Sequence, residues 1–239
     1  MPSPAEFAEA LRGRRNRERR RTWSRVVVAA TATVLVAALV WLFFFSDTFR
    51  TRAGTVEGNA LVSADDVLAT AAIPTGMPLV LVDTEPIEAR VLELPEVRSV
   101  TVARDFPDAV RITVEERAAV YQLQDGGTHS WVDADGIVFR TNQASDPELP
   151  VVRVSGERDE RILADIATVV RAIPPAVAGQ VERVDAASVD RIQITLADDR
   201  TVVWGSADDS DLKSRVLTPL LGVDAKVYDV SAPNHPTTR

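Results

Sequence analysis

The hydrophobic pattern is most uneven near the start of the chain. Residues 26–45 are twenty consecutive positions without a charge, and the run ends in three phenylalanines. A helix of that length rises about 30 Å, which matches the hydrocarbon thickness of a bilayer. A cleaved signal peptide has a shorter apolar core and a small-residue cleavage site, whereas Ser46 and Asp47 follow this run. The pattern therefore predicts an uncleaved transmembrane helix over residues 26–45, in preference to a signal peptide or a buried core helix.

Charge is distributed unevenly on the two sides of this span. Residues 1–25 hold eight arginines and three acidic residues, whereas the rest of the chain holds 19 basic and 32 acidic residues. Because arginines beside a span remain in the cytoplasm, we expect a single-pass protein of the cytoplasmic membrane, in contact with membrane lipid, whose C-terminal part lies outside. A nucleic-acid arm is the alternative, but no aromatic residue for base stacking stands between Arg12 and Arg21. We therefore expect no nucleic acid, and the composition predicts a disordered tail.

Residues 54–117 show the pattern of a small α+β unit. In order, they predict a strand from Thr55, a helix behind a capping box at Ser63, an extended segment at 79–82, a helix near Pro86, and strands at 97–104 and 109–116. Val110, Ile112 and Val114 alternate with polar residues, which implies one buried face on the last strand. The order β-α-α-β-β predicts two helices on one face of a three-stranded sheet.

The remainder of the chain predicts a second, β-rich region with covering helices. Its expected elements are a hairpin at 131–139, a helix at 157–173, strands at 181–186, 192–196 and 201–205, a helix at 210–218 that Pro219 ends or kinks, and a last strand at 227–231. The fold class is therefore α+β, with a transmembrane helix, a β-α-α-β-β domain and a mixed β-sheet domain.

Several short motifs carry a family resemblance in their order and spacing. They are Val56-Glu57-Gly58-Asn59, Leu94-Pro95-Glu96-Val97, Arg104-Asp105-Phe106-Pro107-Asp108, Val114-Glu115-Glu116-Arg117, Trp131-Val132-Asp133 and Tyr228-Asp229-Val230-Ser231. Together with the span, they resemble the FtsQ/DivIB family of bacterial division proteins over residues 26–236. Ala118-Ala119-Val120 departs from the family, which often has a proline there, and Asp198-Asp199 replaces a common glycine turn.

The resemblance implies six regions along the chain. These are a cytoplasmic basic tail (1–25), the transmembrane helix (26–45), a linker (46–53), a POTRA domain (54–117), an FtsQ-type β-domain (118–232) and a C-terminal tail (233–239). It also implies a place at the division septum and a scaffolding role. The implied partners are the single-pass proteins FtsB (DivIC in Gram-positive bacteria) and FtsL, and through them the synthases FtsW and FtsI.

Residue chemistry gives little support to an enzyme. The chain has no cysteine, and its two histidines, His129 and His235, are far apart in sequence and are expected at the surface. Ser210 and Lys213 match the S-x-x-K motif of penicillin-binding proteins, but the accompanying K-T-G is missing. We therefore interpret Ser210 as a helix cap. A membrane-anchored cell-wall enzyme remains an alternative if a pocket surrounds this pair.

Acidic clusters also receive structural interpretations. Asp133 and Gly136 resemble the start of a calcium loop, but Ala144 stands where that loop needs a glutamate, so a hairpin turn is favoured. Three carboxylate pairs are expected to be solvated surface: Asp65 with Asp66, Glu115 with Glu116, and Asp208 with Asp209. We expect no catalytic residue, no metal and no cofactor.

A binding surface is the remaining interpretation, and strand addition to an exposed sheet edge is the favoured mechanism. The expected edge is the last strand, where Pro233 and Pro236 follow and donate no hydrogen bond to a ladder. Its candidate partner-binding residues are Val227, Tyr228, Asp229, Val230 and Ser231. The alternative for Tyr228 is packing in the β-domain core. A POTRA protein of an export system is a further alternative, although such proteins have tandem repeats before a barrel.

Overall fold

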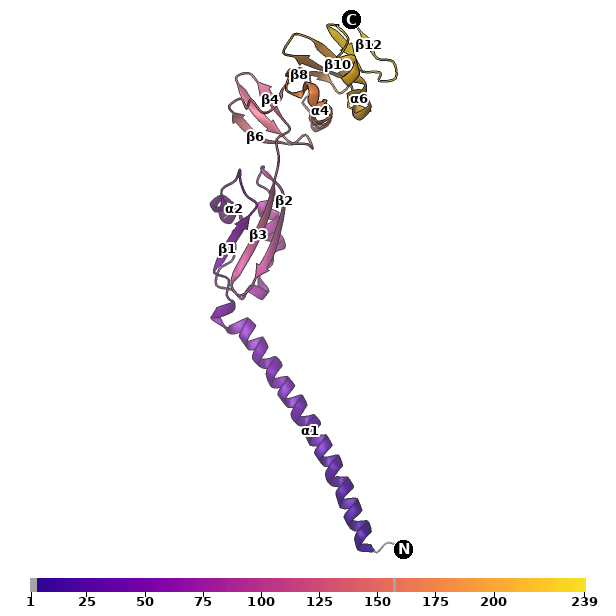
Figure 1. Cartoon of the computed structure of the whole chain (residues 1–239). Coiled ribbons are helices and arrows are strands. Elements are labelled where there is room, and N and C mark those ends of the chain that lie inside the picture. The colour runs from indigo at the N-terminus through magenta and orange to yellow at the C-terminus, as the bar shows by residue number, and fades with distance from the viewer. Residues whose placement is uncertain (1–3, 157) are drawn as a thin grey trace. The chain divides into compact units, whose positions relative to one another are not determined.

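The computed structural model describes residues 4–156 and 158–239, and for residues 4–22 it describes the backbone alone. A single helix, α1 (Pro4–Phe45), opens the chain (Figure 1). Its segment Trp23–Phe45 is apolar and long enough to cross a membrane, and none of it is buried in the protein. The predicted disorder of the tail is wrong from Pro4 onward, because this segment is helical; it holds eight arginines, three alanines and three glutamates, all strong helix formers.

Contacts divide the chain into two compact units. The first holds α1, β1, residues 64–89 and residues 101–113. The second holds residues 58–63, 90–100 and 114–239. Several segments that precede Arg117 in sequence thus belong to the same unit as the larger sheet: the loop at 58–63, the end of α3 with the start of β2 (90–100), and the end of β3 (114–116).

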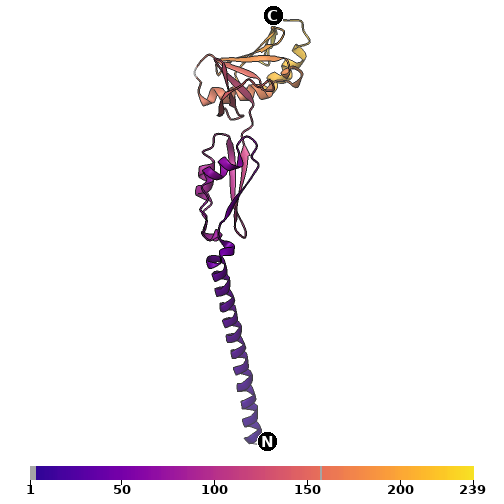
Figure 2. The same cartoon turned by 90° about the vertical axis from the view of Figure 1, so that its left-hand side faces the viewer.

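The smaller sheet has the strand order β1 (Ala53–Glu57), β3 (Ala109–Glu116) and β2 (Val97–Asp105), with β1 parallel to β3. Helices α2 (Ala64–Ala71) and α3 (Glu85–Val91) both lie on one of its faces (Figure 2). The predicted β-α-α-β-β order is therefore confirmed. One detail is wrong: the segment expected to be extended forms a 3₁₀ turn, η2 (Leu79–Leu81), because Pro78 at its start favours a turn and Leu79 packs fully into the core.

Two motif residues hold the end of this sheet together. Gly58 has φ +84°, and a Cβ there would lie 2.2 Å from the Val114 carbonyl oxygen, so only glycine fits. The Glu116 carboxylate accepts hydrogen bonds from the backbone N–H groups of Ala60 (2.9 Å), Leu61 (2.7 Å) and Val62 (2.9 Å). Burial alone would raise the pKa of Glu116, but these three bonds, together with the positive charge of Arg140, lower it.

The larger sheet has nine strands in the order β12-β11-β10-β9-β8-β7-β4-β5-β6. In chain order they are β4 (Tyr121–Asp125), β5 (Thr128–Val132), β6 (Val138–Gln143), β7 (Val151–Val154), β8 (Val181–Ser188), β9 (Arg191–Leu196), β10 (Thr201–Gly205), β11 (Val227–Asp229) and β12 (Thr237–Thr238). The β5–β6 pairing confirms the predicted hairpin. Strands β4, β7 and β12 were not predicted.

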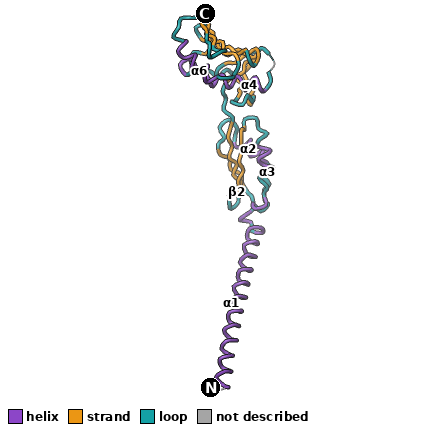
Figure 3. The backbone as a smooth tube through the Cα atoms, turned by 90° about the vertical axis from the view of Figure 1, so that its right-hand side faces the viewer, coloured by secondary structure: helices purple, strands orange, loops and turns teal. Residues whose placement is uncertain are grey.

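Three helices accompany this sheet: α4 (Glu160–Ala172), α5 (Pro175–Ala178) and α6 (Ser210–Leu220). Helices α4 and α6 lie on one face of the sheet (Figure 3). The predicted start of α4 at residue 157 lies outside the described residues, and the helix begins after Asp159, whose carboxylate accepts a hydrogen bond from the Ile162 N–H at 2.8 Å. The core between the helices and the sheet includes Tyr121, Ile166, Ile194, Trp204 and Leu217.

Candidate interaction edge

Strand β11 is held in the sheet by a buried tyrosine. Tyr228 is 1% exposed, and its hydroxyl donates a hydrogen bond to the Val223 carbonyl oxygen at 2.7 Å. The Arg200 guanidinium lies 5.8 Å from the centre of the tyrosine ring. Val230 is also fully buried. Packing in the core, the alternative raised for Tyr228, is therefore what the structure shows.

Arg200 joins this tyrosine to the hairpin before β10. Its Nε donates a hydrogen bond to the Asp198 carboxylate at 2.6 Å. Desolvation alone would raise the pKa of Asp198, but the hydrogen bonds from Arg200 lower it. Asp199 takes a positive φ of +62° at the same turn. An aspartate thus supplies the left-handed residue of this turn.

The chain returns after β11 and covers the edge that we expected to be open. The Asp229 carboxylate accepts hydrogen bonds from the N–H and hydroxyl of Ser231, which turn the chain out of the strand. Thr237 and Thr238 then pair with β11 in antiparallel register. The prediction that residues 227–231 form the sheet edge is therefore wrong. Pro236 donates no hydrogen bond, but the β-branched threonines that follow it do form a strand.

The register of this pairing fixes which backbone groups point outward. Val227 and Arg239 exchange two hydrogen bonds, each 2.9 Å from nitrogen to oxygen, which marks a hydrogen-bonded antiparallel pair. Thr238, opposite Tyr228, is therefore in a non-hydrogen-bonded position. Because the two kinds of pair alternate, the N–H and C=O of Thr238 point away from β11. Among the described residues no further strand lies beyond β12.

The five candidate residues consequently differ in how far they are exposed. Tyr228 and Val230 are buried, Val227 and Asp229 are half-buried, and Ser231 is exposed. None of their backbones forms the outermost ladder, because β10 lies on one side of β11 and β12 on the other. The residue of the outermost strand that sequence reasoning missed is Thr238. Its signal was the Thr-Thr pair, two β-branched residues of high strand propensity.

The opposite end of the sheet is built differently. The β5–β6 ladder is interrupted by register shifts on both sides of Trp131, and Asn142 takes a positive φ of +56°. Arg140 on β6 donates a hydrogen bond to the Leu61 carbonyl oxygen at 2.9 Å and pairs with Glu96 at 3.5 Å. Bulges and an occupied edge are features that prevent edge-to-edge pairing.

The S-x-x-K pair does not form a catalytic arrangement. Ser210 donates its hydroxyl hydrogen to the Ala207 carbonyl oxygen at 2.7 Å and accepts a hydrogen bond from the Trp204 indole. Lys213 is 2% exposed and donates to the Ser206 carbonyl oxygen at 2.8 Å. Burial lowers the pKa of Lys213, against the attraction of Asp208 and Asp209. Both side chains therefore secure the loop before α6. Ser210 is the first residue of the helix rather than its cap, because Asp209 holds the cap position.

Other candidate groups also have structural roles. Asp133 is 3% exposed, and its carboxylate accepts hydrogen bonds from the Asp135 and Ile137 N–H groups and pairs with Arg117 at 2.6 Å. His129, expected at the surface, is 9% exposed, because β5 places it in the interior of the sheet. No group of acidic or histidine side chains within the described residues is arranged to hold a metal ion.

Comparison with known proteins agrees with this architecture. Residues 49–117 match the family described as POTRA domain, FtsQ-type, and residues 119–230 match the family described as Cell division protein FtsQ/DivIB, C-terminal. The Cell division protein FtsQ of Streptomyces collinus is 34% identical over 234 residues, which cover 92% of this chain and 89% of that protein. The FtsQ of Mycolicibacterium smegmatis is 36% identical over 214 residues, which cover 88% and 63%.

Among solved structures, the major extracytoplasmic domain of DivIB from Geobacillus stearothermophilus is similar over 41% of this chain and 85% of its own, with 17% identity and a TM-score of 0.34. That likeness is too distant to support an argument about the site. The two family matches and the long alignments with FtsQ proteins are sufficient by themselves. This chain belongs to the FtsQ/DivIB family of bacterial cell division proteins.

Proposed function

We propose that this protein is a non-enzymatic scaffold of the division complex that binds an FtsB/DivIC-like partner, together with an FtsL-like partner, by strand addition at β12. In this proposal α1 anchors the chain in the cytoplasmic membrane at the septum, with its N-terminus in the cytoplasm. The arginines before the span support that orientation. The bound partners would link the scaffold to the septal synthases FtsW and FtsI.

The observation that carries the proposal is the outward backbone of Thr238. Strand addition uses main-chain hydrogen bonds, so the receiving edge needs an unpaired N–H and C=O in extended conformation. Thr238 supplies both, at the end of a sheet whose other end is interrupted and contacted. A short strand of small polar residues leaves room for an incoming segment.

The test is a proline substitution that removes one outward N–H. Thr238→Pro should leave the β11–β12 ladder in place, because the Arg239 and Val227 groups that form it are untouched. Thr238→Val is the matched control, since it keeps the N–H and the β-branched shape. We expect Thr238→Pro to weaken the partner about tenfold, as measured by titration of the full chain in detergent with the FtsB/DivIC-like protein of the same genome. Equal affinity in a folded Thr238→Pro protein would refute binding at this edge.

Localisation tests the broader part of the proposal. A fluorescent protein fused to the N-terminus should concentrate at midcell in dividing cells. A uniform membrane signal would contradict the division role, whereas midcell signal with unchanged binding in Thr238→Pro would contradict only the edge.

A further inference from the structure

Several exposed apolar side chains lie at one end of the POTRA domain, the end next to α1. Outside α1, the large apolar side chains exposed among the described residues are Val80, Leu81, Leu92, Phe106, Val138 and Val223. Three of these six lie at this end, on η2 and on the β2–β3 hairpin. Val80 is 38% exposed, and Leu81 and Phe106 are each 51% exposed. We call these three residues the apolar base.

The apolar base continues the surface of α1. The ring centres of Phe43 and Phe106 lie 6.2 Å apart, and Phe49 lies 4.7 Å from Phe43 and 6.3 Å from Phe106. A cavity of about 320 Å³ is lined by side chains of α1 between Val36 and Phe44, together with Val80 and Phe106. No polar atom lines this cavity. The part of its lining that α1 supplies therefore belongs to the segment that is long and apolar enough to cross a membrane.

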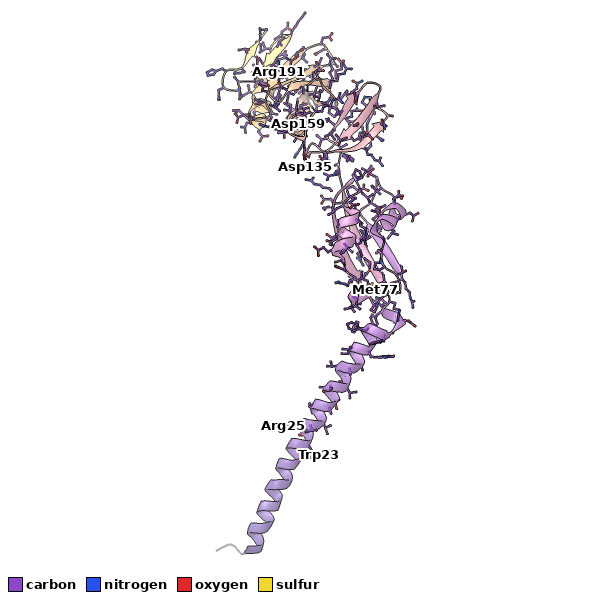
Figure 4. All side chains as sticks on the ribbon, turned by 180° about the vertical axis from the view of Figure 1, so that it is seen from behind. Trp23, Arg25, Met77, Asp135, Asp159 and Arg191 are labelled. Atoms are coloured by element: carbon purple, nitrogen blue, oxygen red, sulfur yellow. The ribbon has the colours of Figure 1, made fainter. Side chains whose placement is uncertain are left out.

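The segment that connects α1 to the POTRA domain is short and is tied to that domain by backbone pairing. After Phe45 the chain forms a 3₁₀ turn, η1 (Asp47–Phe49), and Arg50 already bridges to Pro78. The Thr51 N–H donates a hydrogen bond to the Met77 carbonyl oxygen at 2.9 Å, and Met77 is labelled beside the end of α1 in Figure 4. Five residues span at most about 18 Å when fully extended, so η2 stays close to the bilayer.

Basic side chains occupy the level just past the span. The side chain of Arg52 is 62% exposed and that of Arg50 is 42% exposed; Arg50 pairs with Asp47 at 2.9 Å, and Arg52 pairs with Asp108 at 3.9 Å. Exposed arginines beside an apolar surface are typical of the interface between the acyl chains and the phosphate groups of lipids. The arrangement favours lipid over a soluble partner, because the apolar base is continuous with the span and charged side chains begin only past it.

We propose that the apolar base is immersed in the outer leaflet of the membrane, where Val80, Leu81 and Phe106 contact lipid acyl chains. The POTRA domain then rests on the bilayer instead of being held above it by a free linker. This inference rests on the proposed membrane anchoring of α1, but it concerns a separate contact.

The absence of cysteine from the sequence makes a depth measurement direct. Single cysteines replace Phe106 and Leu81, and each receives a nitroxide label in the full chain reconstituted into phosphatidylglycerol and phosphatidylethanolamine liposomes. Val34→Cys, in the middle of the span, is the lipid control, and Leu92→Cys, exposed on the POTRA domain, is the water control. Collision rates with oxygen, which concentrates in the bilayer, are compared with those of a water-soluble nickel chelate.

We expect the labels at 106 and 81 to collide with oxygen severalfold more than with the nickel chelate, as at 34, while the label at 92 shows the reverse. Nickel accessibility at 106 and 81 equal to that at 92, with 34 in lipid, would overturn the inference and leave the anchor intact. Protection of 106 from both reagents would also overturn it, because protein would then cover the base. An aqueous label at 34 would overturn the anchor together with the inference.

Discussion

The two edge strands of the nine-stranded sheet, β6 and β12, differ in the regularity of their pairing and in the residues that contact them. At the β6 end the ladder is broken by register shifts, and Arg140 is engaged with Leu61 and Glu96. At the β12 end the ladder is regular, and the outermost residue, Thr238, turns its backbone outward. An edge that is neither bulged nor covered is a hazard for aggregation. In the proposed function, this difference leaves the β12 end available for pairing with a partner strand.

Two separate features occur at the β12 end: the packing of a side chain in the core, and the exposure of backbone hydrogen-bonding groups. Tyr228 fixes the position of β11 from inside the core, whereas Thr238 presents the groups that a partner strand would meet. A substitution at Tyr228 therefore tests folding, and a substitution at Thr238 tests binding. The largest effects on stability should come from the first kind.

Removal of the Tyr228 ring should give the largest loss of stability. Tyr228→Ala leaves a cavity and an unsatisfied Val223 carbonyl group, so we expect the free energy of unfolding to fall by about 3–5 kcal/mol. Tyr228→Phe keeps the ring and should cost only about 1 kcal/mol. Urea unfolding of the full chain in detergent, followed by tryptophan fluorescence, measures both. A cost for the alanine variant as small as that for the phenylalanine variant would show that β11 is not fixed by this side chain.

The sequence predicted the elements whose hydrophobic pattern is local and long. The span is a run of twenty uncharged residues, and Val110, Ile112 and Val114 alternate along β3. Strand β7 escaped prediction because its neighbours are distant and parallel, as in the pairing of Leu123 with Val152. Strand β4 is short, and its antiparallel pairing with the adjacent β5 was also missed. Propensity over four or five residues is too weak to identify such strands.

The candidate site was predicted only in part, for a similar reason. Residues 227–231 were expected to form the sheet edge, but the outermost ladder depends on two residues that follow a proline-rich turn. His129 was misplaced because one buried histidine on a short strand leaves no periodic signal. The role of Glu116 was also missed, since its three backbone donors lie more than fifty residues earlier in the chain.

Substitution of Glu116 should give the next largest loss of stability, and this loss should depend on pH. It secures Ala60, Leu61 and Val62, and the Leu61 carbonyl in turn accepts the hydrogen bond from Arg140 at the β6 end. Glu116→Gln should lower the free energy of unfolding by about 2 kcal/mol at neutral pH. Glu115→Gln is the matched control, because the Glu115 carboxylate accepts a hydrogen bond from the exposed Ser99 hydroxyl, and it should change stability by less than about 0.5 kcal/mol.

The sign of the pH effect follows from the lowered pKa of Glu116. Its contribution is fully present above the usual carboxyl pKa of 4.5 and is lost as the pH falls through the lower folded value. The difference between wild type and Glu116→Gln should therefore shrink on acidification below that value. A difference that stays constant down to the acid limit of folding would contradict the hydrogen-bonded carboxylate.

Substitution of Arg140 should give the smallest loss of stability. It also tests whether the β6 end of the sheet takes part in partner binding. Arg140→Met removes the bond to Leu61 and the pair with Glu96 but keeps an unbranched side chain over Trp131, so we expect a loss of about 1 kcal/mol. Affinity for the FtsB/DivIC-like partner should not change. Arg153→Met, at an exposed arginine bonded to Gln124, is the control for removing a surface charge. A loss of partner affinity in Arg140→Met alone would move the binding surface to the β6 end.

Hydrogen exchange tests strand addition at the β12 end most directly, because it compares both ends of the sheet in one experiment. The full chain in detergent is exposed to deuterated buffer with and without the FtsB/DivIC-like partner, and peptides covering residues 232–239 and 137–143 are followed by mass spectrometry. The partner should slow exchange in residues 232–239, where the Thr238 N–H points outward, and leave residues 137–143 unchanged. Slowed exchange at residues 137–143 with none at 232–239 would contradict strand addition at β12.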